Sequence, residues 1–353
     1  MRAVSGSPEK NGPVRFAALP VWDVHAHYLP ATALPLMQSG QAVVALETVR
    51  GDAESITLNG MPVGATIHQL SSADVILASM DGMGIERRVL SPPPFTYRYW
   101  QDPENGLRLC RLLNDAHAEL VNDHPERFIA LATVPLQDPL RAGRELRRAV
   151  EQLGVAGVTV GTNVAGRNLA DPEFRGFFRA AAEMSVPILV HPDFVPVPRL
   201  ADYYLVNLIG MPVETATALA NIILAGMLEE LPMLRMCFLH GGGAAPFLVG
   251  RWARGWQVRP ETRRDTTLSP IEQIQMVYFD TLTHSPDALA YLVRLMGAGH
   301  VVVGTDAPFD VEDPSPLETL GKAPGLSEED RAVIERLAPL AWLFGDPPRE
   351  AIE

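Results

Sequence analysis

Two histidines separated by one residue, His25 and His27, stand at the end of the apolar run VWDVHAH, residues 21–27. On a β-strand alternate side chains point to the same side, so both imidazoles would project together. Two imidazoles held side by side are natural ligands for a metal ion. The bare pair is equally compatible with two unrelated histidines at a strand end, so other residues must decide.

Two more histidines and one aspartate follow short apolar runs of strand-like composition. They are His191 in VPILVHP, His240 in LRMCFLHGG and Asp306 in VVVGTDAPF. Imidazole nitrogens and a carboxylate oxygen suit Zn²⁺, and Mn²⁺ is also compatible. Three histidines and one aspartate would leave a position for water, as a catalytic site requires. We therefore predict one bound divalent metal ion, with zinc favoured.

The other five of the nine histidines do not join this set. They lie in helical patterns, in the segment after the first strand, or beside strands, and we expect structural or surface roles for them. These histidines are His68, His117, His124, His284 and His300.

Short β-branched runs alternate with helical patterns, and they define the elements that must position the candidate residues. Eight strands are expected at 19–27, 86–94, 127–135, 155–162, 186–192, 234–242, 276–283 and 300–308. Helical patterns cover 104–123, 138–153, 172–184, 212–229, 244–256, 285–296 and 327–338. Strands separated by helices pair in parallel through right-handed crossovers. Eight such units predict an α/β fold of the (β/α)8 TIM barrel type, with a doubly wound open sheet as the competitor.

The predicted barrel forms one domain over residues 15–345, between an N-terminal tail, 1–14, and a C-terminal tail, 346–353. The segment 31–85 is too long for a simple crossover, and Asn59-Gly60 lies between strand-like flanks, which favours a hairpin. We therefore expect a small insertion over the barrel mouth. In such barrels chemistry is located at the C-terminal ends of the strands, where all five candidate residues fall.

The composition and net charge of the chain limit the kinds of molecule that it is expected to bind. The chain has 353 residues, 47% of them hydrophobic, and a formal net charge of −13, which disfavours nucleic acid and anionic membranes. The most apolar stretch, 205–232, contains Glu214 and Asn221, and we interpret it as a buried helix rather than a membrane span. The N-terminus has no apolar core of signal-peptide length, and the two cysteines suggest no disulfide framework. We expect a cytoplasmic protein that acts on a small molecule.

Several stretches at the predicted strand ends resemble the aminocarboxymuconate-semialdehyde decarboxylase family of the amidohydrolase superfamily. They include HPDF at 191–194, LIGMPVETATA at 208–218, HGGGAAPFLVGR at 240–251 and VVVGTDAPF at 301–309, and the resemblance extends from about residue 21 to about 345. It implies a metal-dependent TIM barrel in which zinc is held by the residues that match His25, His27, His191 and Asp306.

The resemblance also implies roles for two residues outside this ligand set. The histidine that matches His240 acts as acid and base on the metal-bound water. The arginine that matches Arg251 binds a substrate carboxylate, in the bacterial enzyme across a homodimer interface. Many superfamily members hold two metals bridged by a carboxylated lysine, but this chain has no lysine between Lys10 and Lys322. We therefore expect a single metal ion.

Two departures from the family pattern lie in the substrate pocket. The family's other carboxylate-binding arginine falls near Gly64, and no arginine occurs between Arg50 and Arg87. The family's substrate-facing tryptophan falls at Asn207. These departures put aminocarboxymuconate semialdehyde itself in doubt as the substrate. Phe309, just past the predicted aspartate ligand, is a further candidate for the pocket wall.

Three functions remain open at this point. The leading hypothesis is a metal-dependent, non-oxidative decarboxylase of a small unsaturated or aromatic carboxylic acid, with catalytic residues His240 and Asp306. The alternative is a metal-dependent hydrolase of a small cyclic amide, lactone or ester, because the same site could activate water against a carbonyl. A barrel that binds a ligand without turnover is the third, and the complete set of candidate ligands argues against it.

Overall fold

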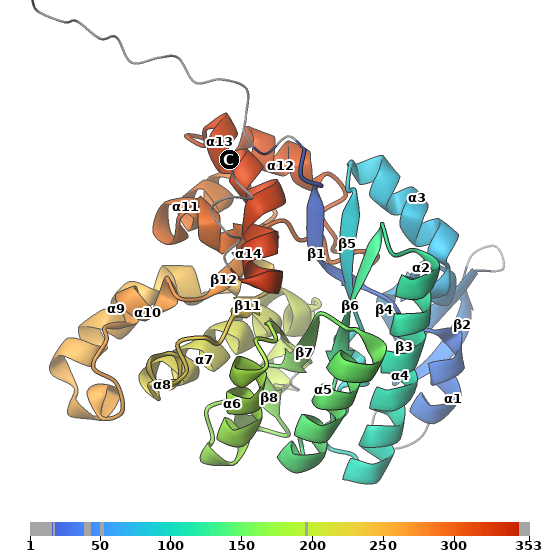
Figure 1. The fold of residues 1–353 in the computed structure, drawn as a ribbon, viewed down its shortest axis with the longest axis horizontal. Coiled ribbons are helices and arrows are strands. Elements are labelled where there is room, and N and C mark those ends of the chain that lie inside the picture. Colours follow the sequence, from blue (N-terminus) through green and yellow to red (C-terminus); the bar gives the residue numbers. More distant parts are fainter. Residues whose placement is uncertain (1–15, 17, 39–43, 50–52, 195–196, 346–353) are drawn as a thin grey trace, which may run out of the picture.

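The computed structural model describes residues 16, 18–38, 44–49, 53–194 and 197–345. Its centre is a sheet of eight parallel strands in the order β1-β5-β6-β7-β10-β11-β12-β13 (Figure 1). These strands are β1 (Trp22–His27), β5 (Arg87–Ser91), β6 (Phe128–Thr133), β7 (Gly157–Gly161), β10 (Ile188–His191), β11 (Met236–Phe238), β12 (Tyr278–Asp280) and β13 (Val301–Val302).

The first and last strand segments meet and close the sheet. The backbone N–H of Val24 donates to the carbonyl of Val303 at 2.8 Å, and that of His27 donates to Ala307 at 2.9 Å. Ala26 and Ala307 form a parallel bridge. The predicted eight-stranded barrel is therefore confirmed, and the open sheet is excluded.

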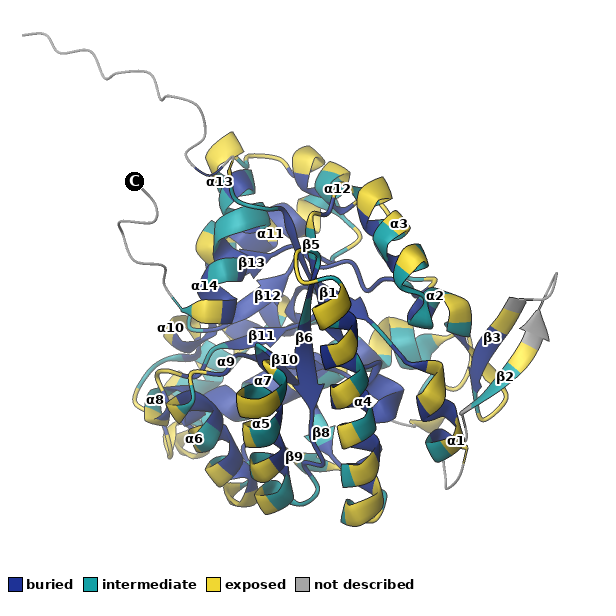
Figure 2. Cartoon of the chain, turned by 45° about the vertical axis from the view of Figure 1, so that its right-hand side comes forward, coloured by how far each residue is buried: buried dark blue, intermediate teal, exposed yellow. Residues whose placement is uncertain are grey.

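Helices cover the outside of the barrel and turn their apolar faces towards the strands (Figure 2). Several begin at side-chain caps that the sequence contains: Asp102 caps α4, Asp138 caps α5 and Ser285 caps α11, each followed by proline. The helices are α1 (Leu34–Met37), α2 (Ile67–Ser71), α3 (Ala73–Met83), α4 (Pro103–Asp123), α5 (Pro139–Leu153), α6 (Arg175–Glu183), α7 (Met211–Leu224), α8 (Met227–Glu230), α9 (Ala245–Val258), α10 (Pro270–Ile274), α11 (Pro286–Met296), α12 (Pro316–Lys322), α13 (Glu328–Ala332) and α14 (Ala338–Phe344).

The predicted insertion is a small antiparallel sheet between β1 and β5. It consists of β2 (Val44–Val49), β3 (Ala53–Leu58) and β4 (Met61–Thr66), with Asn59 and Gly60 forming the β3–β4 turn at φ 52° and 78°. Positive φ at both turn residues matches a two-residue hairpin, so this prediction is confirmed. A further two-stranded ribbon, β8 (Asn163–Val164) with β9 (Arg167–Asn168), was not predicted.

Three predicted helices are shorter or broken in the structure. The stretch 172–184 begins with a 3-10 turn, and 212–229 is interrupted by Gly226 at φ 65°. The stretch 327–338 passes through a π-helical turn, Val333–Leu337, just before Pro339, which has no N–H for a regular helix bond. The predicted tails 1–14 and 346–353 lie outside the described residues.

Of the described helices, one stretch, Val206–Leu224, is long and apolar enough to cross a membrane by length and composition. It includes a π-helical turn, Val206–Gly210, and α7. Leu219 and Ile222 of α7 are fully buried in the main core cluster. We therefore interpret this stretch as a covering helix of the barrel.

Candidate metal centre

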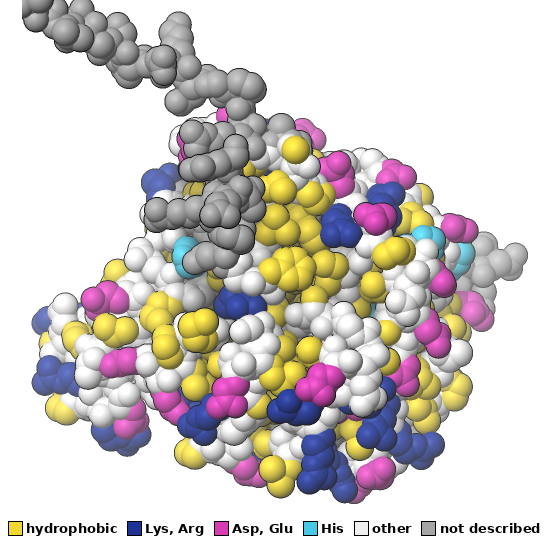
Figure 3. Space-filling model, in the orientation of Figure 1, with side chains coloured by type: hydrophobic (Ala, Val, Ile, Leu, Met, Phe, Trp, Pro, Cys, Tyr) yellow, Lys and Arg dark blue, Asp and Glu magenta, His cyan; other side chains and the backbone are white. Residues whose placement is uncertain are grey.

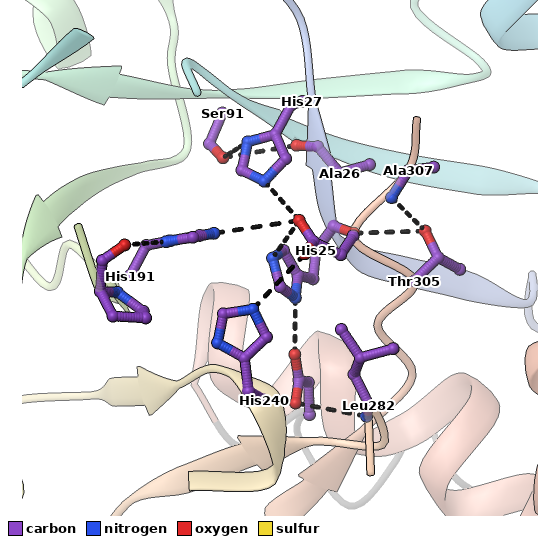
Figure 4. A network of polar contacts seen from close by, with 12 residues as sticks. His25, Ala26, His27, Ser91, His191, His240, Leu282, Thr305 and Ala307 are labelled. Atoms are coloured by element: carbon purple, nitrogen blue, oxygen red, sulfur yellow. Dashed lines mark hydrogen bonds and ion pairs between the residues drawn. The ribbon is translucent and has the colours of Figure 1, made fainter. Parts of the chain in front are cut away.

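The four candidate histidines converge on one point (Figure 4), and Asp306 lies among them. His25 and His27 come from β1, His191 ends β10, and His240 and Asp306 follow β11 and β13. The ring centroids of neighbouring histidines lie 5.1 to 5.4 Å apart. The predicted meeting of distant strand ends is therefore present in the structure.

Asp306 is the common partner of the four imidazoles. Its Oδ1 lies 2.9 Å from His27 Nε2, 3.2 Å from His25 Nε2 and 3.9 Å from His191 Nε2. Its Oδ2 lies 3.5 Å from His240 Nε2. Each of the four histidines thus presents its Nε2 atom to the same carboxylate.

Outer hydrogen bonds fix the tautomers of two of the imidazoles. His191 Nδ1 donates to the backbone carbonyl of Pro192 at 2.6 Å, and His25 Nδ1 lies 2.7 Å from Asp280 Oδ2. Because these partners accept protons, the lone pair of each ring is on Nε2. Neither Nε2 atom forms a hydrogen bond, although both are buried. Buried nitrogens that can turn a lone pair towards a carboxylate fit a divalent metal ion.

Charge and burial have opposite effects on the pKa values of this cluster. Burial lowers the pKa of His191 to about 3, and it also lowers that of His27. For His25, burial lowers the pKa, but the charges of Asp306 and Asp280 and the hydrogen bonds to them outweigh it and raise the pKa to about 10, so a cation bound here would displace a proton from Nε2. Burial would raise the pKa of Asp306, but the nearby histidines hold it well below its usual value. Asp306 is therefore ionised at neutral pH, as a carboxylate ligand of a metal ion would have to be.

Unusual backbone geometry aims His240 and Asp306 at the centre. His240 has φ 57° and Asp306 has φ 63°, both in the left-handed region. After His240, Gly243 also has a positive φ, and a Cβ there would lie 2.3 Å from the carbonyl oxygen of Pro212. The glycines after His240 therefore permit close packing at the barrel rim.

The nitrogen and oxygen donors of four residues lie within 4.8 Å of one another, namely those of His25, His191, His240 and Asp306. His27 contacts the same Asp306 oxygen at 2.9 Å but is outside this group. We predicted His240 as the acid and base. In the structure it lies as close to Asp306 and to the other histidines as a metal ligand would. The division of roles between His27 and His240 stays a prediction.

Sequence reasoning missed Asp280, which ends β12 and is fully buried. Besides binding His25, its Oδ1 accepts a 2.6 Å hydrogen bond from the backbone N–H of Gly241, next to His240. Gly304 leaves room for it, because a Cβ there would lie 2.8 Å from both the Asp280 and the His25 Cβ atoms. The only sequence signal was an aspartate at the end of a strand, in YFD.

A pocket of about 620 Å³ opens beside the centre and is lined by His240 and Asp306. Asn207, the position of the family's tryptophan, also lines it. Phe309 is buried and packs against the His27 ring, with ring centroids 5.2 Å apart. Arg251 is exposed on α9 and is not among the residues that line this pocket.

A closed parallel barrel with histidines and an aspartate at the carboxyl ends of its strands is the architecture of a metal-dependent barrel enzyme. The amidohydrolase family profile matches residues 22–344, and the chain belongs to this family. This agrees with the resemblance seen in the sequence motifs.

Comparison with individual proteins points in the same direction. Over 276 residues, 78% of this chain and 77% of the relative, the chain is 36% identical to the 2-amino-3-carboxymuconate-6-semialdehyde decarboxylase of Dictyostelium discoideum. The crystal structure of 5-carboxyvanillate decarboxylase LigW from Sphingomonas paucimobilis matches with a TM-score of 0.78 and 25% identity, covering 92% of this chain and 99% of LigW. The 5-carboxyvanillate decarboxylase of Novosphingobium aromaticivorans, solved with bound manganese, shares the fold, with a TM-score of 0.79, 19% identity and coverage of 95% and 99%.

Proposed function

We propose that this protein is a metal-dependent, non-oxidative decarboxylase of a small aromatic or unsaturated carboxylic acid. The observation that carries the proposal is the convergence of four imidazole Nε2 atoms on Asp306 at the mouth of a pocket. The relatives named above are decarboxylases of such acids, which favours this reaction over hydrolysis of a cyclic amide, lactone or ester.

The division of labour follows from burial and position. A divalent cation bound by His25, His27, His191 and Asp306 would supply Lewis-acid charge for the substrate carboxylate. His240 is partly accessible and lines the pocket, so it can deliver a proton to the carbon that loses CO₂. The C–C bond breaks, its electron pair enters the unsaturated system, and the new C–H bond takes the proton. Asp306, next to His240, would orient that imidazole.

The test is to incubate the metal-loaded protein with a panel of hydroxybenzoic, aminobenzoic and unsaturated acids, together with lactones, cyclic amides and esters. We expect CO₂ release from at least one acid, with formation of the decarboxylated product. Hydrolysis of a lactone, amide or ester without any CO₂ release would refute the proposal.

Zinc is our choice for the metal, because three imidazoles and one carboxylate are a typical zinc ligand set. Manganese is the alternative that the Novosphingobium structure supports. Elemental analysis of protein purified without added metal should find one zinc per chain. Two metals per chain would contradict the single site that the missing lysine indicates.

We further propose that the enzyme is a homodimer in which Arg251 of one subunit serves the pocket of the other. Phe247, on the same helix as Arg251, lines the pocket and is 86% exposed, and the nearby Leu208 is 54% exposed. Such apolar exposure beside a pocket is typical of an interface. Mixing inactive Arg251→Ala and His240→Ala variants should restore part of the activity, whereas separate monomers would not complement.

We also assign the protein to the cytoplasm and treat residues 15–345 as one domain with its insertion at 31–85. On the face in Figure 3, basic and acidic side chains are interspersed, and the net charge is −13. Both features support a small-molecule enzyme rather than a protein that binds nucleic acid or anionic membranes. Cell fractionation and limited proteolysis test these two assignments.

A further inference from the structure

Two acidic side chains form part of the pocket wall next to the catalytic centre. Asp310 and Glu312 line the same pocket as His240 and Asp306. Within the described part of the chain, neither carboxylate forms a hydrogen bond or an ion pair, and the lining residues include no arginine or lysine. The carboxylate oxygens of both residues therefore have no partner among the described side chains, and they are available to a bound substrate.

Asp310 lies next to Gly64, the position at which the family pattern has an arginine. Gly64, in β4 of the insertion, has φ 82°, and a Cβ built there would lie 2.3 Å from Asp310 Oδ1. The aspartate thus occupies the space that a side chain at position 64 would need. At this point of the pocket wall, an anionic group stands where the family pattern has a cationic one.

Glu312 is the second acidic residue of this pocket wall, and it is less exposed than Asp310. We call these two residues the acidic wall. Glu312 is partly buried, and this burial raises its pKa, while Asp23, Asp306 and Asp313 add negative charge and Arg88 counteracts it. A substrate carboxylate next to Glu312 would face repulsion, whereas a hydroxyl or amino group would find an acceptor.

We propose that Asp310 and Glu312 are specificity-determining residues, which select acids that carry a hydroxyl or amino group away from the reacting carboxylate and disfavour acids with a second carboxylate there. This inference rests on the proposed function, because it assumes that the reacting carboxylate binds at the His240 and Asp306 end of the pocket. The rest of the substrate then points towards the acidic wall.

The experiment measures binding rather than turnover. Three probes of similar shape, 3-hydroxybenzoate, 3-aminobenzoate and benzene-1,3-dicarboxylate, are titrated calorimetrically into the metal-loaded full-length protein. We expect the first two to bind roughly tenfold more tightly than the dicarboxylate, the size of effect that one close like-charge contact produces. In Asp310→Asn and Glu312→Gln the dicarboxylate should gain affinity and the gap should fall to a few-fold.

Glu318→Gln is the matched control. Glu318 is exposed on α12 and pairs with Lys322, so its substitution removes the same charge without changing the pocket. We expect the control to keep the wild-type preference. Thermal unfolding should be unchanged in Asp310→Asn, because the side chain is exposed and has no described hydrogen-bond partner.

The outcomes separate this inference from the proposed function. Equal affinity for all three probes in wild type and variants would overturn the inference, even if CO₂ is released from some acid. A preference that depends on Asp310 would sustain the inference, even if none of the probes is decarboxylated. Failure of all three probes to bind would overturn the inference alone, because the proposed function is tested by CO₂ release from the wider panel of acids.

Discussion

His27 and His240 are the pair of residues whose roles most need separation, because both face Asp306. His27 is fully buried, whereas His240 is partly accessible and lines the pocket. A buried imidazole suits a ligand, and an accessible one suits a group that exchanges protons with a substrate.

We therefore predict that His27→Ala loses bound metal, whereas His240→Ala keeps one metal per chain and loses activity by about 10²- to 10⁴-fold. Metal content by elemental analysis and CO₂ release would be measured on the same preparations. Loss of metal in His240→Ala with retention in His27→Ala would reverse the two roles.

Asp280 is a positioning residue in this scheme. It fixes the His25 tautomer and also holds the backbone N–H beside His240, so one carboxylate orients residues from two strands. Removal of such an outer partner typically weakens metal binding by about 10- to 100-fold. We predict this loss for Asp280→Asn, measured by competition with a chromophoric chelator.

Glu145→Gln is the control for Asp280→Asn. Glu145 is also a buried carboxylate, but it bonds Asn114 and Arg148 of the outer helices. Its substitution should lower stability and leave metal affinity unchanged. Equal metal affinity in Asp280→Asn and wild type would remove the positioning role.

Among individual residues, the sequence predicted the position of those that lie directly at strand ends in recognisable patterns. His25, His27, His191, His240 and Asp306 meet as expected because parallel strands bring their carboxyl ends together. Asp280 was missed because its signal is a single aspartate, and its role depends on the distance to His25 in the folded barrel. The exposure of Arg251 likewise depends on packing that no local pattern encodes.

The rim turn 241–243 is the element that connects β11 with α9 and aims His240. Gly243 has φ 60° and packs against the carbonyl of Pro212, at the start of α7. Only glycine fits this conformation and this space without a shift of the turn.

Gly243→Ala should therefore destabilise the protein by about 2 kcal/mol or more and abolish activity. The alanine would have a strained backbone at positive φ, and its Cβ would also clash with the carbonyl oxygen of Pro212. Gly250→Ala is the control, since Gly250 lies in α9 with open space at its Cβ position. It should be neutral or stabilising by about 0.5 to 1 kcal/mol. Urea unfolding would be followed for both, and equal midpoints would argue against the role of the turn.

Element types were predictable from alternating β-branched runs and helical periodicity, but element ends were not. The eighth strand is only Val301–Val302, because the chain then turns to place Asp306 at φ 63°. The last predicted helix contains a π-helical turn before Pro339, and the following helix, α14, buries Trp342 in the core. Tertiary contacts of this kind override local propensity.

At the scale of the whole molecule, acid stability should depend on His117. This residue is buried in α4, where its Nδ1 donates to the carbonyl of Leu113, and burial lowers its pKa to about 4. The unfolded chain, with a pKa near 6.5, binds this proton more readily, so stability falls as the pH drops from about 6.5 towards 4. The loss from this group is about 2 kcal/mol at pH 5.

His117→Asn keeps a side-chain donor and removes the titration. We predict that its free energy of unfolding is lower than wild type near pH 7.5, but that it falls less, by about 2 kcal/mol, between pH 7.5 and pH 5. Urea titrations of metal-free protein at both pH values measure this, because acid release of metal then does not contribute. Parallel pH profiles for variant and wild type would contradict the assignment.

The seam between β1 and β13 joins the beginning of the barrel to its end. The histidines of β1 are made early in synthesis, whereas the carboxylate they surround follows about 280 residues later. A nascent chain that has not yet emerged to Asp306 can present imidazoles but no anionic ligand. We therefore expect the cation to bind most tightly once β13 has joined β1, and its binding would then stabilise the junction that is made last.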